Sequence, residues 1–265
     1  MRWTKEKMAV LGIDIGSAAS KGIIMEGRKT LASFECPSGG DLKQTAERIR
    51  KELLAMTALS AEQIACTVAT GFGSQMVAYA DKVKTDLSCH GKGTISLSPS
   101  VRTAVDVGDL YSKAFRIDPQ GNVVNFLLSG KCAGGSGRIL QVIAKVLQVK
   151  VQDIGDLSLQ SKKRVDFSTG CVVFAESEAV SRIAEGAAKE DLLAGIHRAL
   201  AAQIHTLAER IGIEKDLALV GGGARDAGLV KAMEEISGDR VIVPPNPHMT
   251  AALGAAIIAA ETTSL

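Results

Sequence analysis

The pattern of hydrophobic and polar positions predicts an α/β protein that opens with a three-stranded meander. Apolar runs at residues 8–16, 21–26 and 29–36 are separated by short turns containing glycine and lysine. Residues 41–58 then carry isoleucine and leucine at helical spacing. Residues 66–73 form a further short apolar run that ends in a glycine turn. This order predicts three strands, a helix and a fourth strand.

The same order of elements starts again near residue 100. Apolar runs at residues 100–108, 112–118 and 122–130 predict a second three-stranded meander. Several helical patterns follow, together with a buried strand that begins at residue 217. The proline-rich stretch 244–247 is the clearest interruption of regular structure, and it precedes the last predicted helix. The predicted helices of this part are 136–148, 172–187, 189–212, 226–236 and 249–261.

Two copies of one motif mark the restart. Residues 13–22 read IDIGSAASKG and residues 105–114 read VDVGDLYSKA, so Asp14 and Asp106 lie 92 residues apart (106 minus 14) in the same context. Each copy ends a predicted strand, and each continues with Ser-Lys and a second strand, which indicates a duplication. We therefore predict two related domains that face each other across a cleft. The first takes residues 1–98 and 249–265, and the second takes residues 99–248.

The repeated turns have the character of anion-binding loops. Glycine lets backbone N–H groups approach an anion closely, and the first turn is small and rich in hydroxyl groups. Asp14 and Asp106 suit a Mg²⁺ ion that is held largely through water, with phosphate oxygens completing its shell. The glycines at residues 221–223 follow a strand and precede a helix, so they leave bare backbone for a nucleotide base and ribose.

Composition and motif searches exclude several other classes. The chain has no G-x-x-x-x-G-K-[ST] and no G-x-G-x-x-G motif. A net charge of +2 and an aromatic content of 3% argue against a nucleic-acid or acidic-membrane partner. The longest mostly apolar run, residues 249–260, is short of the roughly 20 residues that span a bilayer. Since residues 1–16 do not resemble a signal peptide, we expect a cytoplasmic protein.

Two of the five cysteines stand beside predicted helix starts. Cys132 precedes the glycine-rich turn AGGSG, and Cys171 follows STG. Helix N-terminal amides and the helix dipole favour a thiolate at such positions. Two thiolates are too few for a [4Fe–4S] cluster, but a two-fold dimer would supply four. Buried structural thiols are the commoner case for isolated cysteines, so spacing alone leaves both interpretations open.

The repeated Asp-x-Gly motifs resemble those of the actin-like ATPase superfamily. Within it, the chain resembles the activators of 2-hydroxyacyl-CoA dehydratases and the ATPase subunits of benzoyl-CoA reductases. The resemblance runs from about residue 9 to residue 260. The segments that carry it are 87–93, 131–149, 168–187, 190–201 and 220–235. It implies an α/β fold with two ribonuclease-H-like domains and a nucleotide cleft between them.

The resemblance also implies roles for individual residues. Asp14 and Asp106 would be the catalytic carboxylates, and Cys132 and Cys171 would be ligands of one [4Fe–4S] cluster shared between two subunits. The last predicted helix would return to the first domain. The residues expected to bind ATP or ADP with Mg²⁺ are Gly16, Ser17, Ala18, Ala19, Ser20, Lys21, Gly108, Asp109, Gly221, Gly222 and Gly223.

The implied activity is electron transfer driven by ATP hydrolysis. A ferredoxin or flavodoxin would donate an electron, and the protein would deliver it at low potential to an acyl-CoA dehydratase or reductase. The two subunits would form a homodimer, or a heterodimer as in benzoyl-CoA reductases. Two alternatives remain open: a small-molecule kinase with inert cysteines, and an interaction module that uses nucleotide only as a conformational switch.

The second phosphate loop departs from the family pattern. Family members usually carry Gly-Gln-Asp after Asp-x-Gly, where this chain has Gly108 followed by Asp109-Leu110-Tyr111. The missing glutamine is a candidate for orienting the attacking water. Elsewhere, we expect Cys36 and Cys66 to be structural, Cys89-His90 to occupy a loop, and His197 to be a helix-packing residue.

Overall fold

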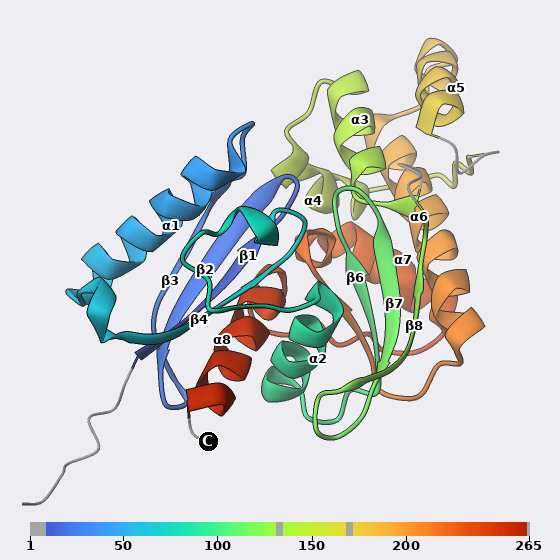
Figure 1. Cartoon of the computed structure of the whole chain (residues 1–265). Coiled ribbons are helices and arrows are strands. Elements are labelled where there is room, and N and C mark those ends of the chain that lie inside the picture. The colour runs from blue at the N-terminus through green and yellow to red at the C-terminus, as the bar shows by residue number, and fades with distance from the viewer. Residues whose placement is uncertain (1–8, 131–134, 168–171, 264–265) are drawn as a thin grey trace, which may run out of the picture. The chain divides into compact units, whose positions relative to one another are not determined.

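The computed structural model describes residues 9–130, 135–167 and 172–263, which form two compact units, each built on its own sheet (Figure 1). One unit comprises the chain up to Leu97, Gln120–Asn122 and the part from Met249 onward. The other comprises Ser98–Pro119 and Val123–His248. In the described part of the chain, no helix has the length and apolar character needed to cross a membrane.

The first unit has a five-stranded sheet in the order β3-β2-β1-β4-β5. Strands β1, β2 and β3 form the predicted antiparallel meander, whereas β4 runs parallel to β1 and β5 parallel to β4. Because β1 is central, all seven of its residues are buried, which explains its continuous apolar run. The strands are β1 Ala9–Ile15, β2 Ala19–Glu26, β3 Lys29–Pro37, β4 Ile64–Thr70 and β5 Lys82–Val83.

Helices cover both faces of this sheet (Figure 1). Helix α1 (Leu42–Thr57) starts at Asp41, whose side chain accepts a hydrogen bond from the Gln44 amide, and buries Ile49 and Leu53 against one face. Helix α8 (Thr250–Thr263) packs on β1, β2 and β4 from the other side. The short 3₁₀ segments of this part are η1 Ala61–Gln63 and η2 Ser74–Met76, and η6 Pro247–Met249 lies at the boundary between the two units.

Helix α2 (Asp86–Leu97) packs on α8 through close backbone contact. A side chain on Gly93 would overlap the Thr250 carbonyl oxygen, and one on Gly254 would overlap the carbonyl oxygen of Cys89. The loop predicted for Cys89-His90 is therefore wrong, because both residues lie in α2. The two glycines of GKG lower intrinsic helix propensity, but the close contact that Gly93 allows with α8 outweighs that preference.

The second unit repeats the meander and adds a larger set of helices. Its sheet has the order β8-β7-β6-β9, with β6 parallel to β9 and antiparallel to β7. Helix α6 packs on the meander and on α3, α4 and α7, and its apolar face forms the centre of one core. The strands are β6 Thr103–Val107, β7 Ser112–Ile117, β8 Val123–Leu128 and β9 Leu217–Val220.

The helices of this unit agree with the sequence pattern to within a few residues. Their described bounds are α3 Arg138–Val146, α4 Ile154–Ser158, α5 Val172–Ala184, α6 Lys189–Ile211 and α7 Ala227–Ser237, with 3₁₀ segments η4 Val151–Asp153 and η5 Gly222–Arg225. Helix α4 was not predicted, because five residues are too few for a periodic signal. The predicted α/β class with two sheets is confirmed.

We expect Gly254→Ala to destabilise the protein by about 1–3 kcal/mol, because the added methyl group must push α2 away from α8. Urea unfolding followed by circular dichroism measures the change. Gly40→Ala is the matched control, since a side chain there would meet nothing within 4 Å. Equal stabilities of the two variants would contradict the close packing of α2 and α8.

Candidate functional site

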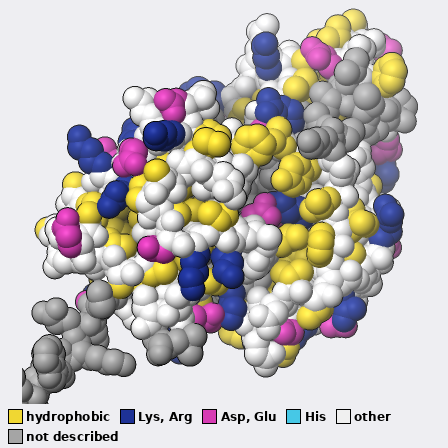
Figure 2. All heavy atoms as spheres, in the orientation of Figure 1, with side chains coloured by type: hydrophobic (Ala, Val, Ile, Leu, Met, Phe, Trp, Pro, Cys, Tyr) yellow, Lys and Arg dark blue, Asp and Glu magenta, His cyan; other side chains and the backbone are white. Residues whose placement is uncertain are grey.

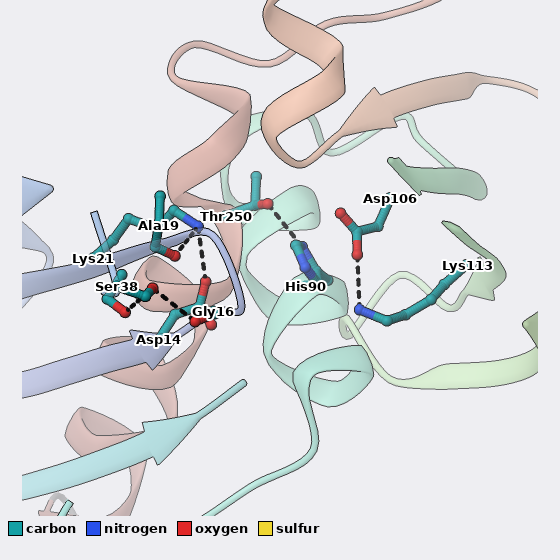
Figure 3. A network of polar contacts seen from close by, with 10 residues as sticks. Asp14, Gly16, Ala19, Lys21, Ser38, His90, Asp106, Lys113 and Thr250 are labelled. Atoms are coloured by element: carbon teal, nitrogen blue, oxygen red, sulfur yellow. Dashed lines mark hydrogen bonds and ion pairs between the residues drawn. The ribbon is translucent and has the colours of Figure 1, made fainter. Parts of the chain in front are cut away.

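The first repeat motif places a carboxylate at the end of the central strand of the first unit. The antiparallel register sets Asp14 on β1 directly opposite Lys21 on β2. Lys21 Nζ lies 3.4 Å from Asp14 Oδ2 and donates a hydrogen bond to the Ala19 carbonyl oxygen at 3.1 Å (Figure 3). Both side chains are nearly buried, so this ion pair fixes the carboxylate with little screening by solvent.

A serine outside the motif supports the first loop. Ser38, just after β3, donates a hydrogen bond from Oγ to the Gly16 carbonyl oxygen at 2.7 Å (Figure 3). Its hydroxyl also lies 2.7 Å from that of Ser20, and its amide donates to the Ala18 carbonyl oxygen at 3.0 Å. Gly16 must be glycine, because a side chain would overlap the Ala19 carbonyl oxygen. Sequence reasoning missed Ser38, which carries no motif signal of its own.

The second repeat motif builds the same arrangement in the second unit. Asp106 on β6 stands opposite Lys113 on β7, with Nζ 2.8 Å from Oδ2 (Figure 3). The Lys113 ammonium also lies 5.2 Å from the centre of the Tyr111 ring, a cation–π distance. Ser112, which precedes this lysine, has a buried hydroxyl without a hydrogen-bond partner among the described residues. The repeat in the sequence is therefore matched by a repeated Asp–Lys pair in the two units.

The duplication continues in the strand that runs parallel to each central strand. Gly71 follows β4 with φ +87°, and a side chain there would overlap Asp14 Oδ1. Gly221 follows β9 with φ +81°, and a side chain there would overlap Asp106 Oδ1. Glycine adopts a positive φ readily, and because it has no side chain it leaves room for the neighbouring carboxylate. Gly71 was not predicted as a site residue, although ATGFG after β4 parallels LVGGG after β9.

The third glycine turn adjoins a pocket in the second unit. The pocket has a volume of about 730 Å³, and Ala224, Arg225 and Ala227 are part of its lining. The neighbouring Asp226 starts α7, accepting hydrogen bonds from the amides of Gly228 and Leu229. His197 is buried in α6, as predicted, and its Nε2 lies 3.0 Å from Asp226 Oδ2. This network fixes the turn that leads into α7.

The structure distributes the predicted nucleotide residues over both units. Asp14 and residues 16–21 belong to the first unit, whereas Asp106, Gly108, Asp109 and residues 221–223 belong to the second. In the second unit, the Asp109 carboxylate accepts hydrogen bonds from Arg138 and Gln141 at the start of α3. Sequence patterns gave no indication of this link between the loop and the helix.

The cysteines fall into two groups. The predicted cluster ligands Cys132 and Cys171 lie outside the described residues. Cys36, Cys66 and Cys89 are buried, which confirms the structural role predicted for the first two. Burial raises the pKa of Cys36 and Cys66, and it raises the pKa of Cys89 to about 12. Among the residues that the structure describes, no three His, Cys, Asp or Glu side chains are grouped as a metal site.

Comparisons with known proteins agree with this geometry. The chain is 40% identical over 252 residues to the 2-hydroxyisocaproyl-CoA dehydratase activator of Clostridioides difficile, covering 95% of each chain. It is 30% identical over 260 residues to one of the subunits of the benzoyl-CoA reductase of Thauera aromatica, covering 93% of this chain and 91% of the relative.

A solved structure is similar over nearly the whole chain. Component A of the (R)-2-hydroxyglutaryl-CoA dehydratase of Acidaminococcus fermentans superposes with a TM-score of 0.94 at 39% identity, covering 97% of this chain and 100% of that one. This similarity supports the predicted actin-like fold. The model of the BadF/BadG/BcrA/BcrD ATPase family matches residues 11–259. The chain therefore belongs to the BadF/BadG/BcrA/BcrD ATPase family.

Proposed function

We propose that the protein hydrolyses ATP to deliver low-potential electrons to a 2-hydroxyacyl-CoA dehydratase or a related reductase. The observation that carries the proposal is the duplicated half-site, a buried Asp–Lys pair beside a glycine loop in each unit. The 40% identity to a dehydratase activator adds the class of partner. A ferredoxin or flavodoxin is the proposed electron donor.

Each half-site supports binding of Mg-ATP. The loops after β1 and β6 are kept free of side-chain bulk at Gly16 and Gly108, which leaves backbone amides for phosphate oxygens. Asp14 and Asp106 are carboxylates of the kind that hold Mg²⁺ through water. We assign the adenosine to residues 221–223 and the pocket beside them, where Arg225 offers a planar cation to the base.

Cys132 and Cys171 are the proposed ligands of a [4Fe–4S] cluster shared by two protomers. Such a cluster supplies one-electron chemistry at a potential set by its surroundings. Helix α5 begins at Val172, directly after Cys171, and exposes Phe174, Val180 and Ile183. Hydrophobic side chains are visible at the surface in the region of this helix (Figure 2). Exposed apolar side chains of this size favour burial against another chain, which supports a dimer at this helix.

Residues 161–165, upstream of Cys171, are hydrogen-bonded to helix α6. The Asp191 carboxylate accepts hydrogen bonds from the Ser161 hydroxyl at 2.9 Å and from the amides of Lys162 and Lys163 at 2.8 and 2.9 Å. Arg198 donates to the Val165 carbonyl oxygen at 2.7 Å. The Lys163 amide and its neighbours hold the pKa of Asp191 below its usual range. These contacts hold residues 161–165, upstream of Cys171, against α6.

A component of a heteromeric benzoyl-CoA reductase is the second candidate. It rests on the 30% identity to the Thauera aromatica reductase protein, against 40% for the activator, and on the altered second phosphate loop. In that case the cluster would be shared with a non-identical partner. Size-exclusion chromatography of the purified chain distinguishes the two, because only an activator is expected to form a dimer alone.

We expect Asp14→Asn and Asp106→Asn each to lower the ATPase rate at saturating Mg-ATP by about 100-fold or more, because each removes a charge placed for the metal and phosphates. Phosphate release measures the rate. Asp239→Asn is the control, since that exposed carboxylate only pairs with Lys215. Full activity in both half-site variants would refute the proposed nucleotide site.

We expect about four iron and four acid-labile sulfide per dimer in protein purified without oxygen, and their loss in Cys132→Ala, since the dimer then keeps only two of four thiolates. Cys66→Ala is the control, because that thiol is buried in β4. Iron that is absent from wild type even after reconstitution would leave an ATPase with structural thiols, and kinase assays would follow.

We expect Asp191→Asn to lower stability at neutral pH and to lose this effect in acid. The folded pKa of Asp191 is depressed, so its contribution is complete above its unfolded pKa of about 3.9 and disappears as pH falls through the lower folded value. Urea unfolding at pH 6 and pH 3 tests this, with Asp239→Asn as the control. A difference from wild type that is independent of pH would contradict the assignment.

A further inference from the structure

The second phosphate loop is bonded directly to the start of helix α3. Asp109 is the first of the three residues at which this loop departs from the family pattern. Its carboxylate lies 2.6 Å from Arg138 Nη2 and 2.9 Å from Gln141 Nε2. Arg138 and Gln141 occupy the first and fourth positions of α3, so both face the loop from its first turn. The Asp109 side chain is 9% exposed, whereas the Arg138 side chain is 45% exposed. The carboxylate is therefore the more buried member of this ion pair.

Backbone contacts reinforce the same connection. The Ser136 hydroxyl donates a hydrogen bond to the Asp109 carbonyl oxygen at 2.8 Å, and the Gly137 amide donates to the Gly108 carbonyl oxygen at 2.8 Å. A side chain on Gly137 would lie 3.3 Å from that oxygen, so the approach is close. In the first unit the corresponding carbonyl, that of Gly16, is bonded to Ser38 after a strand instead. The attachment to a helix is thus specific to the second loop.

The loop also holds the chain on the other side of Cys132. Ser129, three residues before this cysteine, donates its amide to the Ser112 carbonyl oxygen at 3.0 Å, and its Oγ accepts from the Ser112 amide at 3.0 Å. Ser136 follows Cys132 by four residues. Both described flanks of the cysteine segment are therefore hydrogen-bonded to residues of the second phosphate loop or its end.

We propose that Asp109 is a positioning residue that joins the second phosphate loop to α3, so that the nucleotide bound at the loop sets the position of the flanks of Cys132. The inference rests on the proposed function, because it requires nucleotide at this loop. A nucleotide that favours one arrangement of the loop must favour the matching arrangement of α3, since charge-assisted bonds tie the two together. The altered sequence of the second phosphate loop would then couple nucleotide binding at this loop to the position of α3.

Amide hydrogen exchange measured by mass spectrometry tests the coupling. Wild type and Arg138→Ala are compared with Mg-ADP and with Mg-ADPNP, following peptides that cover residues 104–112 and 138–147. We expect both peptides to differ between the two nucleotides in wild type. In Arg138→Ala, the difference should persist at 104–112 and disappear at 138–147.

Three further variants serve as controls for this experiment. Lys215→Ala breaks an exposed ion pair elsewhere in the second unit and should behave as wild type. Arg138→Lys keeps the charge and should partly restore the response of α3, which a merely structural role would not predict. If Arg138→Ala does not fold, Gln141→Ala removes the second bond from a partner that carries no charge.

The outcomes separate this inference from the proposed function. A nucleotide response at 104–112 without one at 138–147 in wild type would overturn the coupling alone. The same holds if the response at 138–147 survives in Arg138→Ala and Gln141→Ala. No response to nucleotide anywhere in wild type would overturn both the coupling and the proposed nucleotide site.

Discussion

Each unit depends on one nearly buried carboxylate that must lie at the end of a central strand against bare backbone. Asp14 and Asp106 can occupy these places because a lysine stands opposite each in the register and a glycine with positive φ lies beside each. A charge so placed would be unfavourable without its lysine partner. The second strand of the meander supplies the lysine and the parallel strand supplies the glycine, so three strands in each unit position one carboxylate.

Much of this could be predicted from local sequence. The duplicated Asp-x-Gly motif located both half-sites, because it combines a strand end, a turn and a second strand within ten residues. The long helices α1, α6 and α7 were predicted because their apolar spacing is regular. Family resemblance supplied the roles that spacing alone left open, above all those of Cys132 and Cys171.

The remaining features depend on contacts between distant segments. Ser38 supports the first loop from after the third strand, and Gly71 belongs to a turn more than fifty residues beyond Asp14. Helix α2 was missed because its glycines are unfavourable in an isolated helix and are explained only by α8, some 160 residues later. The bonds between Asp109 and α3 likewise join residues about thirty positions apart, which no local pattern indicates.

The packing of α8 bears on how the chain acquires its structure during synthesis. The face of the first sheet that carries Val10, Ile23 and Val68 is covered by α8, which is translated after the whole of the second unit. Until then, a nascent chain has an apolar sheet face without its cover, while every residue of the second unit up to His248 has already been made. Contacts of such long sequence separation form slowly. The second unit is therefore expected to fold first, and the first unit completes its core only after α8 has been translated.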